Sequence, residues 1–249
     1  MLNCQFSIIK SQLLQWYLAA EEYLAKNISE WGDGVFFTWI VEPTVIFGRH
    51  QVPENEVNTD YCREHNINIV QRKSGGGCVY ADRGNLMLSY IVPSAHPEHV
   101  FSQYLDLIAA ALADLGLAAV RTEHNDILVD GCKVSGNACY ALPTATIVHG
   151  TLLYDVDFDV MQHAITPSAE KLQKHGVESV RQRVRNLRPL LNNVKKTNPN
   201  AAQINSIVDL AHYLSATLCQ AELRLKPEAI SEIESIAATY RISKPTKSI

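Results

Sequence analysis

The sequence has no run of 18 uninterrupted apolar residues and no cysteine pair with CxxC spacing. The first absence excludes an ordinary transmembrane helix. Six scattered cysteines that fit no zinc framework favour free thiols in a reducing compartment. A basic excess is also missing: 22 Lys and Arg against 26 Asp and Glu give a net charge of −4, which argues against a dedicated nucleic-acid binder. Residues 1–10 show no basic segment followed by a small-residue cleavage site, as a secretory signal would. Together these absences lead us to expect a cytoplasmic protein with no nucleic-acid or membrane partner.

The chain is long and apolar enough to fold without disulfides or a structural metal ion. Of its 249 residues, 47% are hydrophobic and 19% charged, and a chain of this length buries roughly 70–75% of the surface that its unfolded form exposes. This apolar content also excludes disorder. We expect the main core over residues 1–190. Residues 191–249 are expected to add a loop and two helices packed on the same domain, with no further full domain.

Periodicity separates the helical segments from the strands. Apolar residues recur at helical spacing over residues 11–26, with Glu21 and Glu22 on the solvent side, and over residues 97–116. Further helices are predicted over residues 55–64 and 158–174, from about Ser206 with Asp209 in a capping box, and after Pro227. The polar stretch 191–200 is predicted to be a loop.

The β-rich segments are short and are separated mostly by hairpin-length gaps. They cover residues 35–41, 44–47, 67–71, 79–80, 86–92, 118–121, 126–129, 133–141 and 144–154. The first two are expected to pair across Glu42 and Pro43, and Asp130-Gly131 is a strong hairpin-turn signal. This pattern predicts an α+β fold with a mixed, mostly antiparallel sheet rather than a doubly wound parallel sheet.

A triple-glycine segment is the densest chemical signal. Arg72 and Lys73 precede Ser74 and the run Gly75, Gly76, Gly77, between two predicted strands. Consecutive glycines let the backbone bend close to a ligand, and exposed amides in such a bend favour anions. The segment is neither a P-loop nor a dinucleotide fingerprint. A phosphate- or carboxylate-binding loop is the functional interpretation, and a plain flexible hairpin loop is the alternative.

Three further features have both a functional and a structural interpretation. Lys133 opens a strand beside small residues, where its ammonium would stabilise a phosphate or an oxyanion; alternatively, it is a solvated surface lysine. His149, within an apolar strand, is either a site residue or a hydrogen-bonded core histidine. Arg181, Arg183 and Arg185 alternate along one segment, where they face phosphates, an acidic partner or only solvent.

Six motifs in order resemble the lipoate–protein ligase A family, within the wider biotin/lipoate ligase group. The motifs lie at residues 18–24, 43–51, 72–85, 125–136, 149–153 and 179–187. The most distinctive are the glycine run with Asp82 and Gly84-Asn85, and Asn125-Asp126 followed by Asp130-Gly131 and Lys133-Val134-Ser135-Gly136. The resemblance implies the catalytic-domain fold of that group, which is similar to class II synthetases.

The resemblance also implies a two-step reaction. Lipoate and ATP, with Mg²⁺, would give lipoyl-AMP and pyrophosphate. The lipoyl group would then pass to a lysine of a carrier domain, such as an E2 subunit or a glycine-cleavage H protein. Lys133 would be the catalytic residue and, with His149, would contact lipoate, while an apolar tunnel would hold the acyl chain. The residues implied for ATP and lipoyl-AMP are Arg72, Gly75, Gly76, Gly77, Cys78, Val79, Tyr80, Asn85, Asp126 and Lys133.

Departures from the family pattern leave more than one function open. Gln71 replaces the first arginine of the usual pair, Ala81 stands where histidine is common, and similar single-chain ligases carry a further small C-terminal domain. Adenylation is therefore also compatible with a separate accessory protein. An ATP-independent octanoyl or lipoyl transferase that uses Cys78, Cys132 or Cys139 is a second possibility, and a non-catalytic carrier-binding protein is a third. The sequence identifies no general base.

Overall fold

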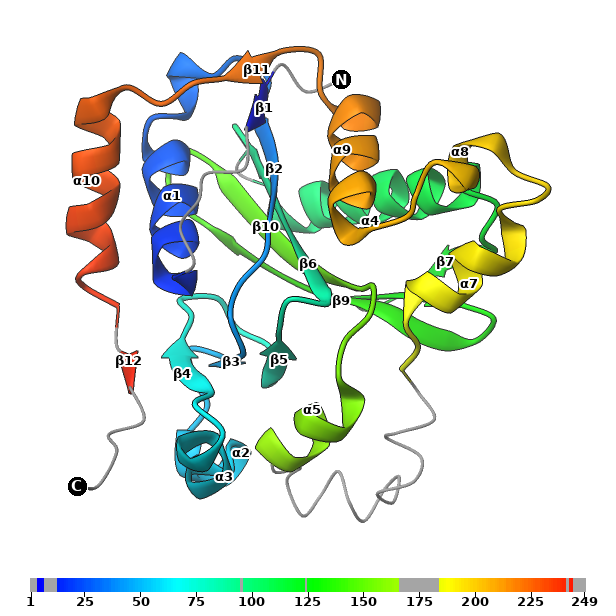
Figure 1. The fold of residues 1–249 in the computed structure, drawn as a ribbon. Helices are drawn as coiled ribbons and strands as arrows, with labels where there is room; N and C mark the ends of the chain where they lie inside the picture. The colour runs from blue at the N-terminus through cyan, green and yellow to red at the C-terminus, as the bar shows by residue number, and fades with distance from the viewer. Residues whose placement is uncertain are drawn as a thin grey trace.

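Two β-sheets form the frame of the protein (Figure 1). The computed structural model describes residues 4–6, 13–94, 96–123, 125–165, 184–240 and 242–243. The larger sheet has the order β11 (Glu222–Leu223), β1 (Cys4–Phe6), β2 (Val35–Trp39), β6 (Asn85–Val92), β10 (Thr146–Leu153), β9 (Cys132–Ala141), β8 (Asp126–Val129) and β7 (Ala119–Arg121). The smaller has the order β12 (Ile242–Ser243), β4 (Asn68–Gln71), β3 (Thr44–Phe47) and β5 (Val79–Ala81).

The predicted fold class is confirmed. Every pair from β2 through β6, β10, β9 and β8 to β7 is antiparallel, whereas β1 is parallel to both of its neighbours and β3 is parallel to β4. The sheets are therefore mixed and mostly antiparallel. All eight residues of β6 and all eight of β10 are buried, because helices cover both faces at the centre of the larger sheet.

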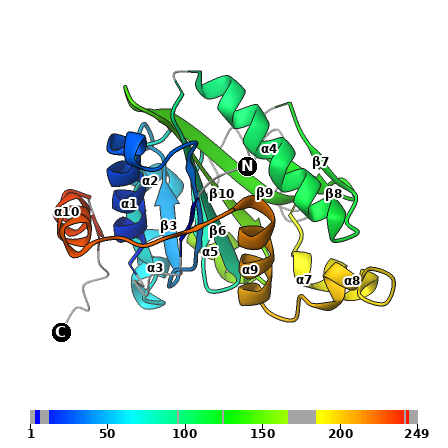
Figure 2. The same cartoon turned by 90° about the horizontal axis from the view of Figure 1, so that it is seen from above.

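Helices pack on the two faces of the larger sheet (Figure 2). On one face α1 (Leu14–Lys26) packs with α10 (Pro227–Ala237), and on the other lie α4 (Pro97–Asp114) and α9 (Ile207–Leu218). The short helices are η1 (Ile28–Glu30), α2 (Pro53–Glu56), α3 (Thr59–Glu64), α5 (Phe158–Ala164), α7 (Leu187–Val194) and α8 (Pro199–Ala202). A third, smaller core joins the small sheet to α5. No helix in the described ranges is long and apolar enough to cross a membrane.

Local signals predicted some elements correctly. Helix α4 begins at Pro97 and its C-terminus is followed by Gly116, whose φ of +82° suits glycine. Asp130 and Gly131 connect β8 to β9 with φ of 50° and 75°, the left-handed pair that a two-residue hairpin turn requires. Ser206 and Asp209 form the predicted capping box of α9.

The predicted pairing of residues 35–41 with 44–47 is wrong. Strand β2 pairs with β1 and β6 in the large sheet, and β3 pairs with β4 and β5 in the small one. Pro43 lacks an N–H and disfavours the helical conformation at the residue before it, and residues 42 and 43 form a bend between the two strands. The chain therefore continues from one sheet into the other instead of folding back.

Two other boundaries differ from the prediction. Residues 55–64 are not one helix, because the buried Val57 is extended and Asn58 caps the new helix α3 by accepting from the Tyr61 amide. Residues 191–200 are not a loop, because Leu191 is buried one turn after Leu187 on α7, and α8 follows. Helix α5 ends at Ala164, and residues 166–174 of the predicted helix lie outside the described residues.

Candidate functional site

A cavity of about 220 Å³ lies where α1, the glycine segment and strands β2, β6, β9 and β10 meet. One part of its wall is apolar and the rest is polar and cationic, so it can hold an amphipathic ligand. It is lined by Leu18, Trp39, Ile46, Arg72, Gly76, Gly77, Cys78, Val79, Met87, Asn125, Lys133, Gly136, Asn137, Ala138, His149, Gly150 and Thr151. Lys133 and the glycine segment therefore border the same space.

The glycine segment is held in its bend by Arg72. The buried guanidinium donates to the carbonyls of Ile46, Gly75 and Gly77 and to the hydroxyl of Ser74, at 2.7–3.2 Å. Burial lowers the pKa of this guanidinium to about 10. All of these acceptors belong to the loop or to the strand beside it, so Arg72 braces the loop from within.

Two glycines make the bend possible. Gly76 has a φ of +91°, which L side chains rarely adopt. A Cβ on Gly48 would lie 2.4 Å from the Gly76 carbonyl oxygen, so the loop after β3 packs directly on the glycine segment. The Arg49 amide donates to the Ser74 carbonyl oxygen at 2.9 Å and fixes that contact.

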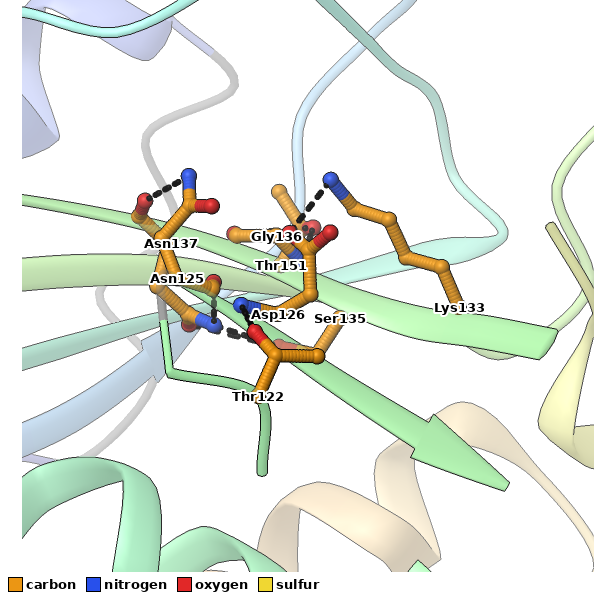
Figure 3. A network of polar contacts seen from close by, with 8 residues as sticks. All are labelled: Thr122, Asn125, Asp126, Lys133, Ser135, Gly136, Asn137 and Thr151. Atoms are coloured by element: carbon orange, nitrogen blue, oxygen red, sulfur yellow. Dashed lines mark hydrogen bonds and ion pairs between the residues drawn. The ribbon is translucent and has the colours of Figure 1, made fainter. Parts of the chain in front are cut away.

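A β-bulge directs Lys133 into the site. Opposite Ile127 and Leu128 of β8, strand β9 presents Ser135 and Lys133, so Val134 is the extra residue. Bulges re-aim neighbouring side chains, and the Lys133 side chain crosses Gly136 to form an ion pair with Asp126, Nζ to Oδ1 2.7 Å (Figure 3). A Cβ on Gly136 would lie 2.9 Å from Lys133 Cε and 3.0 Å from its Nζ.

The cavity opens where two strands part. The β9–β10 ladder reaches Gly150 opposite Asn137. One residue further along, the Thr151 hydroxyl contacts both the amide and the carbonyl of Gly136, at 3.2 and 3.3 Å. Asn125 and Asn137 exchange side-chain and backbone hydrogen bonds of 2.9–3.1 Å, which fix the loop before Asp126 (Figure 3).

His149 lies in the wall of the cavity with both ring nitrogens bonded. Nε2 is 2.7 Å from the Ser74 hydroxyl and Nδ1 is 3.0 Å from Glu21 Oε2. Glu21 is fully buried, so its expected place on the solvent side of α1 is wrong. The spacing could have revealed it, because Glu21 lies three residues before Leu24 and four before Ala25, which are both buried.

Several predicted site residues lie beside the cavity rather than in its lining. Gly75 accepts from Arg72, and Asp126 meets the cavity through Lys133. Tyr80 is buried in the small core, and burial raises the pKa of its phenol. Asn85 is buried beneath β5, with its amide 3.4 Å from the Tyr80 carbonyl oxygen.

The structure also places several of the predicted cysteines and arginines relative to the cavity. Cys78 lines the cavity, whereas Cys132 and Cys139 do not belong to its lining. Burial raises the pKa of the Cys139 thiol, which opposes a nucleophilic role. Arg185 contacts Asp130 at 3.4 Å, and Arg181 and Arg183 lie outside the described residues.

Comparisons with known proteins identify the family of the chain. Residues 14–208 match the family model described as the lipoyl protein ligase A/B catalytic domain. Lipoate–protein ligase 1 of Staphylococcus aureus is 40% identical over 176 residues, which are 70% of this chain and 53% of that protein. A lipoate–protein ligase of Bacillus subtilis is 36% identical over 181 residues, 72% of this chain and 54% of that protein. The chain thus spans about half the length of these curated relatives.

Solved structures share the fold. One is from a study of a bi-partite lipoate protein ligase and its E2 lipoyl domain from Thermoplasma acidophilum, with a TM-score of 0.77, 24% identity, and coverage of 96% of this chain and 93% of that one. Another is a lipoate–protein ligase A bound with ATP, with a TM-score of 0.75, 23% identity and 95% coverage of both chains. At these identities the likeness concerns the fold alone.

Proposed function

Because the chain belongs to the lipoyl protein ligase A/B catalytic domain family, we propose that it activates lipoate with ATP to lipoyl-AMP and transfers the lipoyl group to a protein lysine. One observation carries the proposal: a single cavity joins an apolar wall, a bent glycine segment and the Lys133 ammonium. A free carboxylate is a poor acyl donor, so it needs an activating group at the same place where its carbonyl is held.

The apolar wall suits the acyl chain of lipoate. Leu18, Trp39, Ile46 and Met87 come from four different elements and leave an apolar surface within the cavity. Removing apolar surface from water contributes about 25 cal/mol per Å². His149 borders this wall, which supports the assignment of His149 to the lipoate site. The carboxylate of the bound chain would then point toward Lys133.

Lys133 is the proposed catalytic residue. In the first step a lipoate oxygen attacks the α-phosphorus of ATP, and the bond to pyrophosphate breaks. The Lys133 ammonium would stabilise the negative charge on the phosphate and on the acyl oxygen. Asp126 would hold that ammonium in place, since the pair is 2.7 Å apart and the Lys133 side chain is one-third exposed.

The AMP part is assigned to the glycine segment. The backbone from Gly77 through Cys78 and Val79 to Tyr80 would contact the nucleotide, with Gly75 and Gly76 forming the bend. Arg72 supports this role indirectly, because its guanidinium is occupied by the loop carbonyls. Asn85 would support the segment indirectly, through its contact with the carbonyl oxygen of Tyr80.

In the second step the acceptor lysine forms an amide. Its amine attacks the lipoyl carbonyl, the bond to the AMP oxygen breaks, and the amine loses a proton. The amine must react in its neutral form, although a free lysine has a pKa near ~10.4. Fixed positive charge at Lys133 would favour departure of AMP in this step as well.

Mg²⁺ is proposed to enter with ATP. Among the residues that the structure describes, no group of three or more His, Cys, Asp or Glu side chains could hold a metal ion. Mg²⁺ with nucleotides, however, is usually bound by phosphates, water and one or two carboxylates. The phosphates would therefore supply most of the ligands, and the ion would offset charge on the triphosphate.

Partners and organisation remain proposals. Carrier domains such as E2 subunits or the H protein are the proposed acceptors, and a separate accessory protein is the alternative source of full adenylation activity. A core over residues 1–190 with a C-terminal addition from 191, and a cytoplasmic location, stay predictions. A specific observation supports an acyl transferase as second candidate, because Cys78 lines the cavity.

Pyrophosphate release tests these proposals. The purified chain is supplied with ATP, Mg²⁺ and lipoate, and a ligase releases pyrophosphate. No release, with intact transfer from synthetic lipoyl-AMP to a carrier domain, would point to an accessory partner. ATP-independent transfer from an octanoylated carrier that is lost in Cys78→Ser would instead establish the transferase.

A further inference from the structure

Two hydrogen-bond chains meet at one buried carboxylate behind the cavity wall. Glu21 Oε1 is 2.5 Å from the Ser89 hydroxyl, and Ser89 Oγ is 2.8 Å from Trp39 Nε1. Glu21 Oε2 is 3.0 Å from His149 Nδ1. Trp39 and His149 line the cavity, whereas Glu21 is fully buried and lies outside the lining.

The second chain continues into the glycine segment. His149 Nε2 is 2.7 Å from the Ser74 hydroxyl, which also lies 3.0 Å from Arg72 Nε. Trp39 belongs to the apolar wall and Arg72 to the glycine loop. One carboxylate on α1 is thus linked to the two parts of the cavity that would hold the acyl chain and the nucleotide.

Two groups in this network can only donate. Arg72 Nε and Trp39 Nε1 have no acceptor capacity, so the hydroxyls of Ser74 and Ser89 accept from them, and each hydroxyl keeps one hydrogen and one lone pair. The Glu21 carboxylate only accepts, so Ser89 and His149 Nδ1 donate to it. The remaining hydrogen bond joins Ser74 Oγ and His149 Nε2, and when Ser74 donates in it, the ring is neutral with its proton on Nδ1.

We propose that Glu21 is a positioning residue of the reaction. It fixes the Nδ1–H tautomer of His149 and, through His149 and Ser74, holds the glycine segment at a fixed position relative to the acyl site. This inference rests on the proposed ligase function. An acyl chain packed on the Trp39 indole would act on the same carboxylate that orients the loop, so occupation of the two subsites should be coupled.

The substitution Glu21→Gln breaks the arrangement in either orientation of the new amide. A carboxylate offers two acceptors, and a carboxamide offers one acceptor and one donor. If the amide nitrogen faces Ser89, the Ser89 hydroxyl hydrogen loses its acceptor. If it faces His149, the ring must switch tautomer and the Ser74 hydroxyl loses its acceptor. A buried donor without a partner is unfavourable, and relief of it would move Trp39 or the loop.

The first test needs no variant of Glu21. The ring nitrogens of His149 are observed by ¹⁵N NMR in the full chain, with the signal assigned by its loss in His149→Gln. We expect the neutral Nδ1–H tautomer. An Nε2–H tautomer, or an imidazolium with both nitrogens protonated, would overturn the inference, and this result is independent of whether the protein proves to be a ligase.

The second test separates positioning from folding. Glu21→Gln is compared with Glu234→Gln, the same change on the exposed side of α10, for thermal stability and kinetics. In the wild type we expect bound octanoate to change the Kd for a non-hydrolysable ATP analogue by about fivefold or more. Glu21→Gln should abolish this change in Kd. It should also raise KM for ATP and lower kcat/KM about tenfold or more.

Ser89→Ala keeps the test decisive if Glu21→Gln does not fold. This variant cuts only the Trp39 branch, so the His149 tautomer should persist while the octanoate effect is lost. Wild-type kinetics and an undiminished octanoate effect in folded Glu21→Gln or Ser89→Ala would refute the positioning role. Absence of both pyrophosphate release and transfer from lipoyl-AMP in the wild type would instead refute the proposed function.

Discussion

A methyl group added at Gly136 should displace the proposed catalytic ammonium without unfolding the protein. In Gly136→Ala the new Cβ would lie 2.9 Å from Lys133 Cε, so the side chain must retreat by about 0.5 Å to reach an ordinary contact of 3.4 Å. The obstructing atoms are the end of a flexible side chain, so the cost in stability should be below about 1 kcal/mol. Misplacement of a reacting group by about 1 Å costs about 10²-fold.

We therefore expect pyrophosphate release by Gly136→Ala to fall by about tenfold to a hundredfold, with its Tm close to wild type. Gly131→Ala is the matched control. Gly131 has a φ of +75° but open space around its Cβ position, so alanine should destabilise the fold by about 1 kcal/mol and leave turnover of the folded protein unchanged. Full activity in Gly136→Ala would refute the claim that the position of Lys133 limits the rate.

Three further predictions concern charge, packing and pH. Lys133→Ala should lower the rate of lipoyl-AMP formation by about 10²–10³-fold with little change in Tm; a loss below tenfold in single-turnover kinetics would exclude its catalytic role. Gly84→Ala should lower the free energy of unfolding in urea by about 2 kcal/mol or more, because its Cβ would lie 2.1 Å from the Asp155 carbonyl oxygen; a wild-type midpoint would contradict that contact. The amides and hydroxyl at the start of α9 lower the pKa of Asp209, so its stabilisation is present above the unfolded pKa of about 3.9 and is lost as pH falls through the lower folded value. Tm measured against pH should therefore fall less on acidification in Asp209→Asn than in wild type, and parallel profiles would refute this linkage.

Elements encoded by neighbouring residues could be predicted from the sequence. The Asp130-Gly131 turn depends on two left-handed residues, and the start of α9 depends on Ser206 and Asp209, which are three positions apart. The strand content and the mixed sheet follow from the same short-range patterns. The pairing of β2 was mispredicted, because partner choice depends on which buried surfaces meet and not on the turn between two segments.

The site was predicted in its residue types and less in its contacts. The motifs pointed to Lys133 and the glycine run, and these do border one cavity. The bracing role of Arg72 could not be predicted, because its partners are carbonyls that only the folded loop brings together. The burial of Glu21 could have been predicted from its helical spacing, but its partners could not, because they lie 68 and 128 positions away.

The bulge is the clearest case of information absent from local pattern. Simple alternation along β9 would put Lys133 and Gly136 on opposite faces. The register shift at Ile127 and Leu128 brings both to the cavity, and that shift depends on pairing with β8. The sequence therefore predicts that Lys133 can stabilise a phosphate or an oxyanion, but it does not predict where the Lys133 ammonium points.

The central claim is that one cavity holds both halves of an acyl-adenylate against Lys133. Isothermal titration with a non-hydrolysable lipoyl-sulfamoyl adenosine, with lipoate alone and with adenosine alone tests it most directly. We predict that the linked compound binds at least about 10²-fold more tightly than either fragment and that Lys133→Ala removes most of this gain. Equal affinities for the linked compound and its better fragment, or an undiminished gain in Lys133→Ala, would contradict the account.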